Sequence, residues 1–563
     1  MLKTILLLPG IMAAMWSNAQ DYPQNFFRDP LDIPMQLVAN FGEIRANHWH
    51  MGLDIRTQHR VNLEVHAAAD GYVSRVSIEP GGFGQAVYIT HANGFTTVYG
   101  HLNSFFPALA AYVKEQQYAL QSWAVNLTFQ PDLFPVKKGQ VIALSGSTGA
   151  SEGPHVHFEI RDSKTENCLN PLLFHFPISD AVPPTLLRLA WYNRKKSTYD
   201  QSPVLLSLKK SGNEYHLGSG NLLLVNSDKI SFAIGAVDHF TGSGNGNGIY
   251  SARIIMDGQN VSEFVLDNIS YTDTRYINAQ LDYPYKSRGG ASLQHISPLP
   301  GAQDVVYHVF NEDGLVHLND EQQHEILIEV KDAQQNISRI RFSLQRSGNS
   351  LTSSEEGAVQ KWLPNNLNVF EEKDFEIIST EKSIYDTVRV RFSSSENGAE
   401  HAVSPLFDFL GASIPVHDSV SVRIRLPENF PQQQIQRVVI KNISGSHTSV
   451  VKGEQQSGWV SARFRQFGTY QAFVDEEPPT VNVPSLLVSS GSRIAFTPRD
   501  NFNTIRSFRA EVDGQWLRFS NDKGRSWIYY VDEKFPEGEH ALKVRVEDEA
   551  GNVTVKTWTV RRK

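Results

Sequence analysis

Cysteine and long apolar runs are both scarce in this chain of 563 residues, and each shortage excludes a class of structure. Cys168 is the only cysteine, so intramolecular disulfides are impossible and each domain must be stabilised by its own packed core. For Cys168 itself we expect an ordinary, partly buried thiol and not a catalytic one. Beyond the N-terminus, no apolar run is long enough to cross the ~30 Å hydrocarbon layer of a membrane.

An excess of charge of one sign is missing as well. The formal net charge of −8 is small for a chain of this length, so no global basic surface exists and nucleic acid is not an expected partner. The proportions of hydrophobic (40%) and charged (20%) residues are those of a soluble globular protein. A chain this long is expected to divide into roughly three or four domains.

The first 19 residues have the organisation of an export signal. Lys3 supplies the positive start, Ile5–Trp16 supplies a short apolar core, and Ser17-Asn18-Ala19 places small residues where a signal peptidase cuts. The apolar core is too short to span a bilayer. We therefore predict a signal peptide over 1–19 and a periplasmic, cell-envelope or extracellular location. Because Gln20 and not cysteine follows, no lipid anchor is indicated.

The fold class that we predict is mostly β, and it begins with a domain over 20–180. Short β-branched runs such as 71–76 and 86–90, separated by glycine, indicate an antiparallel β-sheet. The segment from Pro107 to Asn126 is rich in helix formers instead. It predicts a helical insertion, at about 103–138, between two strands of this sheet.

The rest of the chain is all-β in character and contains an internal repeat. Residues 249–259 and 505–515 share the frame I-x-S-x-R-x-x-x-D-G-Q, and 324–336 matches 540–552 at equal length. Both repeats start with Pro-Pro-Thr, and their Asp-Gly pairs predict tight hairpin turns. The predicted units are an Ig-like β-sandwich over 183–346, a linker over 347–358, a separate β domain over 359–475, and a related Ig-like β-sandwich over 478–563.

The repeats show no recurring paired acid, nucleophile or metal-binding cluster in their sequence. We therefore expect the sandwiches to act as spacers or binding modules that are dispensable for bond cleavage, since a sandwich fold alone does not reveal a ligand.

Two histidines at 155 and 157 stand in a β-type segment of the N-terminal domain. Alternate side chains of a strand share a face, so Val156 and Phe158 would enter the core while His155 and His157 line the other face. Such a pair can serve one metal centre, with one imidazole as ligand and the other beside a bound water. Taken alone, an exposed surface pair is the more common explanation.

Two more segments add complementary chemistry. His50 and Asp54, in His-x-Gly-x-Asp, offer an imidazole and a carboxylate, both common zinc ligands. Gly52 favours a tight turn that brings both side chains toward one point. His101 follows an apparent strand, so by itself it could equally be a strand-end histidine without a role.

In combination, these motifs resemble the lysostaphin-like (LytM-type) family of zinc metallopeptidases, which cleave peptidoglycan cross-bridges. The resemblance covers about residues 39–175, and order and spacing both fit. It implies one zinc ion per chain, bound by His50, Asp54 and His157, with His101 and His155 as catalytic histidines that do not bind the metal. The segments that carry it are 41–45, 47–55, 67–73, 97–102, 137–143, 146–149 and 153–159.

The function that the resemblance implies is that of an exported zinc metalloendopeptidase acting on peptidoglycan stem peptides. Because the sequence shows no signature of oligoglycine specificity, we expect a D-alanyl to diamino-acid bond as the target. One alternative is a non-enzymatic LytM-type regulator that activates another cell-wall hydrolase, but such regulators typically lack the zinc ligands. Another alternative is that most of the chain forms an adhesion or scaffold array, and that only a small part of it is enzymatic. The stretch 102–138 is longer than usual in the family, which predicts a lid or a protein-binding hairpin over the groove.

Overall fold

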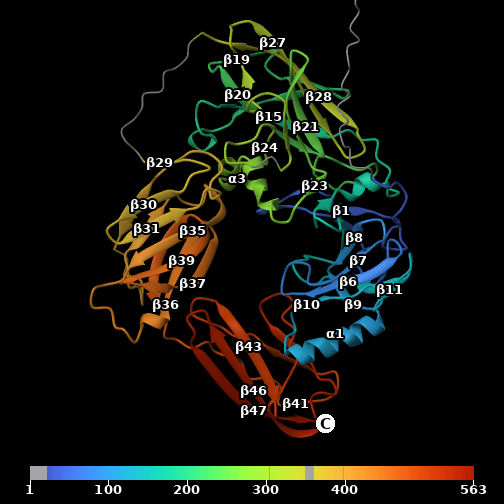
Figure 1. Ribbon diagram of the computed structural model, residues 1–563, viewed down its shortest axis with the longest axis vertical. Coiled ribbons are helices and arrows are strands. Elements are labelled where there is room, and N and C mark those ends of the chain that lie inside the picture. Colours follow the sequence, from blue (N-terminus) through green and yellow to red (C-terminus); the bar gives the residue numbers. More distant parts are fainter. Residues whose placement is uncertain (1–21, 303–304, 349–359, 397) are drawn as a thin grey trace, which may run out of the picture.

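The structure, a computed structural model, describes residues 22–302, 305–348, 360–396 and 398–563. The predicted signal peptide and most of the predicted linker lie outside these residues. The described part consists mainly of β-strands, which confirms the predicted fold class. Figure 1 shows four β-rich units arranged around a ring, and none of the described helices is long and apolar enough to cross a membrane.

The N-terminal domain is built on two antiparallel sheets with a common apolar core that includes Leu53, Val87 and Phe158. The larger sheet has the order β1 (Leu37–Ala39), β4 (Leu53–Arg56), β13 (His155–Asp162), β8 (Phe95–Gly100), β7 (Gln85–Thr90), β6 (Gly71–Ile78) and β10 (Val125–Thr128). The smaller sheet has the order β5 (Glu64–His66), β12 (Val141–Ser145) and β9 (Leu102–Phe105).

The predicted insertion consists of a helix and two short strands. Helix α1 runs over Pro107–Leu120 and buries Leu109, Val113 and Gln117, which are four residues apart and therefore share one face. The helix ends earlier than the sequence predicted, because Gln121 adopts a left-handed conformation (φ 48°) and β10 has begun before Asn126. Strands β10 and β11 (Pro135–Val136) both pair with β6 and widen the large sheet.

The first sandwich is joined to the N-terminal domain by a shared core and by strand pairing. Trp49 and Met51 of the N-terminal domain are packed in the main core of the sandwich, and β14 (Cys168–Leu169) pairs with β23 (Asn268–Ile269). One sheet contains β16 (Val204–Leu206), β15 (Thr185–Asn193), β20 (Lys229–Val237) and β24 (Gln294–His295). The other contains β17 (Leu208–Ser211), β18 (Glu214–Leu217), β28 (Ile337–Arg346), β27 (Gln323–Lys331), β21 (Ser251–Met256), β22 (Gln259–Val265) and β25 (Tyr307–Val309).

The two segments that carry the sequence repeat have the same strand order. In the last sandwich it is β41 (Leu487–Val488), β47 (Val553–Arg562), β46 (Gly538–Asp548), β43 (Ile505–Val512) and β44 (Gln515–Trp516). This order matches β19 (Leu222–Val225), β28, β27, β21 and β22, and in both units the first strand lies parallel to the second. Both Asp-Gly turns have positive φ at each residue, as two-residue hairpin turns require.

Between the two related units lies a domain with two five-stranded antiparallel sheets. Its core includes Trp362, Phe409 and Tyr470. The first sheet has the order β30 (Asn368–Glu372), β31 (Phe375–Ser379), β35 (Pro415–Arg425), β39 (Trp459–Gln466) and β38 (Glu454–Gln456). The second has the order β33 (Phe392–Ser395), β34 (Leu406–Phe409), β40 (Gly468–Val474), β36 (Val438–Ser444) and β37 (His447–Lys452).

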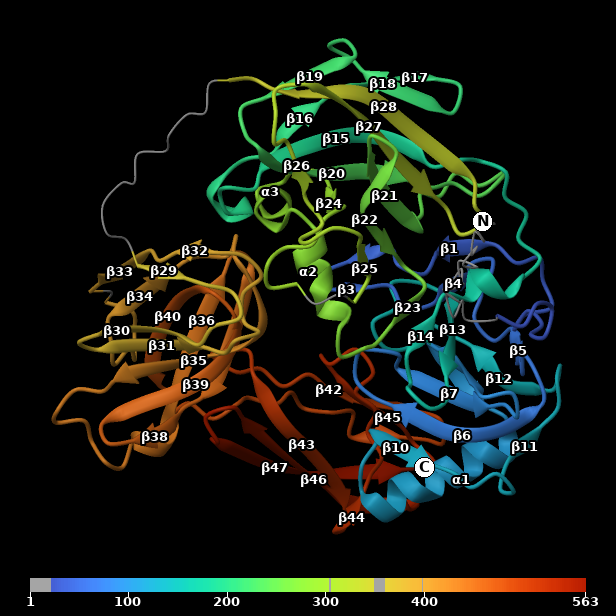
Figure 2. The same ribbon diagram turned by 45° about the horizontal axis from the view of Figure 1, so that its top comes forward.

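The last sandwich closes the ring by packing against helix α1, as both views show (Figure 1, Figure 2). Lys114 of the helix forms an ion pair with Asp532 at 3.0 Å. The ring of Tyr118 packs edge-on against Trp516, with 5.4 Å between their centroids. The insertion that the sequence predicted as a lid or protein-binding hairpin therefore contacts the chain's own C-terminal domain.

Candidate active site

The pairing of three neighbouring strands positions the predicted site residues. Central strand β13 pairs with β4 so that His157 stands opposite Asp54, and with β8 so that His157 stands opposite Gly100, the residue before His101. Val156 on the same strand is fully buried in the core of the sheet. The strand therefore presents His157 on the face where β4 supplies a carboxylate.

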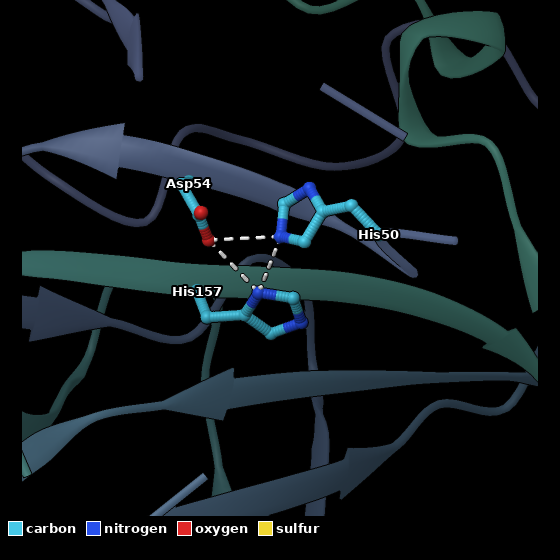
Figure 3. A group of neighbouring side chains, drawn as sticks. All are labelled: His50, Asp54 and His157. Carbon is cyan, nitrogen blue, oxygen red and sulfur yellow. Dashed lines mark hydrogen bonds and ion pairs between the residues drawn. The ribbon is translucent and has the colours of Figure 1, made fainter. Parts of the chain in front are cut away.

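Three polar atoms converge at this point (Figure 3). His50 Nε2 lies 3.0 Å from both Asp54 Oδ1 and His157 Nδ1, and the latter two atoms are 2.9 Å apart. Tetrahedral zinc with bonds of ~2.0–2.1 Å would separate its ligand atoms by about 3.3 Å. The three atoms therefore need to move only slightly to hold a zinc ion, and all three side chains are buried.

The remaining ring nitrogens of the two histidines are held by oxygen atoms. His50 Nδ1 donates to the carbonyl oxygen of Asn40 at 2.8 Å, and His157 Nε2 donates to Glu159 Oε1 at 3.0 Å. Each bond fixes the tautomer, so that the lone pair of the other nitrogen is directed at the shared point. This is the arrangement that metal-binding histidines show, and it means that the donor set fits zinc.

Electrostatics also favour a cation here. Burial raises the pKa of Asp54, but His50 and hydrogen bonds from the neighbouring imidazoles outweigh it and hold this pKa well below its usual value. Burial lowers the pKa of His157, but hydrogen bonds with Asp54 and Glu159 outweigh burial and raise it to about 9. The carboxylates thus favour positive charge at His157, which a zinc ion would supply in place of a proton.

His101 and His155 stand beside this cluster, with their ring centroids 4.7 Å apart. His101 Nδ1 donates to the carbonyl oxygen of Thr148, and His155 Nδ1 donates to that of Gly153, both at 2.8 Å. Nε2 of His101 is left as a proton acceptor, whereas Nε2 of His155 lies 3.4 Å from Asp54 Oδ1. Burial and the neighbouring His157 and His155 lower the pKa of His101 to about 3, so this imidazole is neutral at physiological pH.

Gly52 has a steric role that goes beyond the predicted tight turn. A Cβ atom at this position would lie 2.5 Å from the carbonyl oxygen of Phe158 and 2.9 Å from His157 Nε2. The chain between His50 and Asp54 can therefore cross β13 closely only because residue 52 has no side chain.

Three residues that support the site were not assigned this role from the sequence. Fully buried Glu159, the hydrogen-bond partner of His157, is paired with Arg161 Nη2 at 2.6 Å. Tyr271, from the first sandwich, donates a hydrogen bond to the same carboxylate. The alternation along β13 gave a signal for Glu159 and Arg161, whereas no sequence pattern indicated a tyrosine from another domain.

Comparisons with known proteins agree with this geometry. Residues 48–120 and 133–171 match the model of Peptidase family M23, and 360–475 match that of the Zu5-like domain. An uncharacterized metalloprotease of Haemophilus influenzae is 35% identical over 136 residues, which are 24% of this chain and 22% of the relative. The DD-carboxypeptidase/endopeptidase Mpg of Neisseria meningitidis is 35% identical over 112 residues, 20% of each chain.

These relatives are matched over about a fifth of their length. Among solved structures, the catalytic domain of the M23 protein EnpA from Enterococcus faecalis is 24% identical, with a TM-score of 0.20, and the match covers 26% of this chain and 95% of that one. The family match and the sequence relatives show that the N-terminal domain belongs to the LytM-type peptidases of family M23, as its motifs predicted.

We predict that Gly52→Ala lowers zinc affinity and destabilises the N-terminal domain by about 1–3 kcal/mol, the usual cost of forcing extra volume into a packed site. Gly153→Ala is the matched control, because its added Cβ meets no atom within 4 Å. Zinc titration and thermal unfolding of both variants would test this. Equal zinc affinity in the two variants would contradict the steric role of Gly52.

A second prediction concerns the support of His157. Arg161 and the hydrogen bond to His157 outweigh burial and lower the pKa of Glu159 to about 2, so this carboxylate is charged. Glu159→Gln removes that charge with little change in shape and should weaken zinc binding by ~10–100-fold, the usual loss when a ligand's hydrogen-bond partner is removed. Competition with a chelator of known affinity measures it. Unaltered zinc affinity would show that Glu159 acts only in packing.

Proposed function

We propose that this protein is an exported zinc metalloendopeptidase that hydrolyses peptide cross-links of bacterial peptidoglycan. The observation that carries the proposal is the convergence of three ligand atoms beside the imidazoles of His101 and His155. Nδ1 of each of these two rings donates to a main-chain carbonyl oxygen. The match of the N-terminal domain to family M23 supports it, as does the similarity to Mpg, a DD-carboxypeptidase/endopeptidase. In this proposal the substrate is a stem-peptide cross-link, with a D-alanyl to diamino-acid bond as the target.

His50, Asp54 and His157 would hold the zinc ion and leave a fourth position open. Zinc bound there supplies a Lewis acid that polarises the scissile carbonyl and acidifies a water molecule. The protein's own part is the handling of protons. Nε2 of a neutral His101 or His155 can accept the proton of the attacking water, and the partner imidazole can hydrogen-bond the developing oxyanion.

The proposal is tested by separating metal binding from turnover. His157→Ala should lose zinc and activity together, because it removes a ligand. His101→Ala and His155→Ala should keep zinc and the fold, while turnover of cross-linked muropeptides falls by ~10²-fold or more, since each loses a proton acceptor or an oxyanion donor. Elemental analysis and muropeptide digestion of the same preparations give both readouts.

The same experiment can reject the proposal. Full zinc occupancy in His157→Ala would remove this residue from the ligand set, and loss of zinc from a folded His101→Ala or His155→Ala would place that residue in it. A zinc-loaded wild-type protein that cuts neither sacculi nor muropeptides would contradict an endopeptidase function and favour a LytM-type regulator.

The last sandwich also contacts the wall of the site. Lys523 Nζ donates to the carbonyl oxygens of Ser147 and Gly149, each at 2.7 Å, and to that of Ser151 at 3.0 Å. The same loop carries Thr148, whose carbonyl oxygen orients His101. One ammonium group thus ties three carbonyl groups of the loop together, and its position helps to fix the imidazole of His101. This contact therefore provides a way to test the expectation that the sandwiches are dispensable for bond cleavage.

We predict that Lys523→Ala lowers kcat several-fold while zinc content stays unchanged, because loop 147–151 loses a restraint. Lys534→Ala is the matched control, since this side chain lies on the same domain but over the ring of Tyr118, 5.2 Å from its centroid. Steady-state kinetics on a soluble muropeptide tests both variants. A faster Lys523→Ala enzyme would show that the loop blocks the groove and does not support it.

A further inference from the structure

The two related sandwiches each contain a cluster of three aspartates outside the peptidase site. Asp180, Asp238 and Asp332 form the N-terminal triad. Asp475, Asp500 and Asp548 form the C-terminal triad. In each triad the ligand oxygens lie within 4.8 Å of one another. The expectation that no acid cluster recurs in the sandwiches is therefore wrong, because residues far apart in the sequence meet only when the sandwich folds.

The triads occupy equivalent positions in the two repeats. The first member precedes the Pro-Pro-Thr start, and the third opens the Asp-x-x-x-Asn turn after β27 or at the end of β46. The second directly follows β20 in the first unit and lies in the loop after β42 (Arg493–Phe496) in the second. In that turn the third aspartate accepts a hydrogen bond from the asparagine N–H, at 2.8 Å in both cases. The asparagine Nδ2 in turn donates to the carbonyl oxygen of the first aspartate. The arrangement is thus built twice in one chain.

Buried, unpartnered oxygens face this concentration of negative charge. Asp238 is 1% exposed and Asp548 is fully buried, and one carboxylate oxygen of each has no hydrogen-bond partner among the described residues. Asp180 and Asp500 each have one such buried oxygen too. Within the described chain, none of the six carboxylates forms an ion pair with Lys, Arg or His. Burying charges of one sign without a counter-charge is strongly unfavourable.

A bound cation would satisfy all of these groups. Burial and the neighbouring Asp332 and Asp180 raise the pKa of Asp238 to about 8, which shows how strongly the triad lacks positive charge. Carboxylate and carbonyl oxygens are hard ligands, and calcium accepts six to eight of them at ~2.3–2.6 Å in irregular geometry. Two oxygens on one calcium ion can therefore lie up to about 5 Å apart, which the triads satisfy.

We propose that each triad binds one calcium ion and thereby clamps a connection between domains. Asp180 lies in the segment that leads from the peptidase domain into β15, and Asp475 directly follows β40 of the Zu5-like domain. The other two members of each triad belong to the sandwich that follows. Calcium at each triad ties the incoming segment to that sandwich and restricts the angle between consecutive domains.

The test uses the full-length, zinc-loaded protein after removal of free metal. Equilibrium dialysis against calcium chloride, followed by elemental analysis, should find two calcium ions per chain beside the zinc. Asp238→Asn and Asp548→Asn should each retain one calcium ion, and the double variant none. Asp257→Asn and Asp513→Asn are matched controls, because these aspartates occupy the hairpin turns of the same repeats. Both controls should retain two.

Thermal unfolding separates a cation site from a merely structural cluster. Saturating calcium should raise the melting temperature of the wild type by roughly 5 °C or more, and magnesium should do so far less. In calcium-free buffer, Asp238→Asn should be at least as stable as the wild type, because it removes repulsion. No bound calcium in a folded wild type would overturn the proposal, as would equal calcium loss in the controls. A stability gain at acidic pH without calcium binding would instead assign the triads to shared protons.

Discussion

The register of β13 between β4 and β8 is the constraint on which the peptidase site depends. It sets His157 opposite Asp54 on one side and opposite Gly100 on the other. A slip of one residue would turn His157 into the core and bring Val156 to the metal face. Fully buried Val156, Phe158 and Ile160 resist that slip, since they would lose their packing. The hydrophobic pattern of a single strand thus holds the ligand set in place.

Much of this site could be predicted from the sequence because its signals are local. His-x-Gly-x-Asp and His-x-His are short motifs, and strand alternation by itself places 155, 157 and 159 on one face. The hydrogen bonds that orient the rings are a different matter. Asn40 and Thr148 contribute main-chain carbonyl oxygens, which any residue type can supply, so no sequence pattern marks them.

Contacts between domains were the other part that the sequence could not give. Tyr271 reaches Glu159 from the first sandwich, and Lys523 reaches the 147–151 loop from the last one. Both depend on how whole domains are placed, which local patterns do not encode.

The acid triads show the same limit. Asp332 and Asp548 fall in the matching segments 324–336 and 540–552, and Asp238 and Asp500 lie upstream in the same two units. An isolated aspartate in a turn, however, most often caps backbone N–H groups. Only the folded sandwich shows that three of them share a site.

The closed ring gives the junctions between domains an influence on the peptidase site. The contact of the last sandwich with α1 and the 147–151 loop consists largely of exposed polar and charged groups, such as Lys114 with Glu533. Exposed pairs of this kind are each worth ~1 kcal/mol or less. They persist because the intervening domains keep the two surfaces near one another, which raises their effective concentration. Stiff junctions between domains keep this effective concentration high, whereas flexible junctions lower it. The rigidity of the connections at 180 and 475 therefore affects how firmly a distant domain is held against the candidate site.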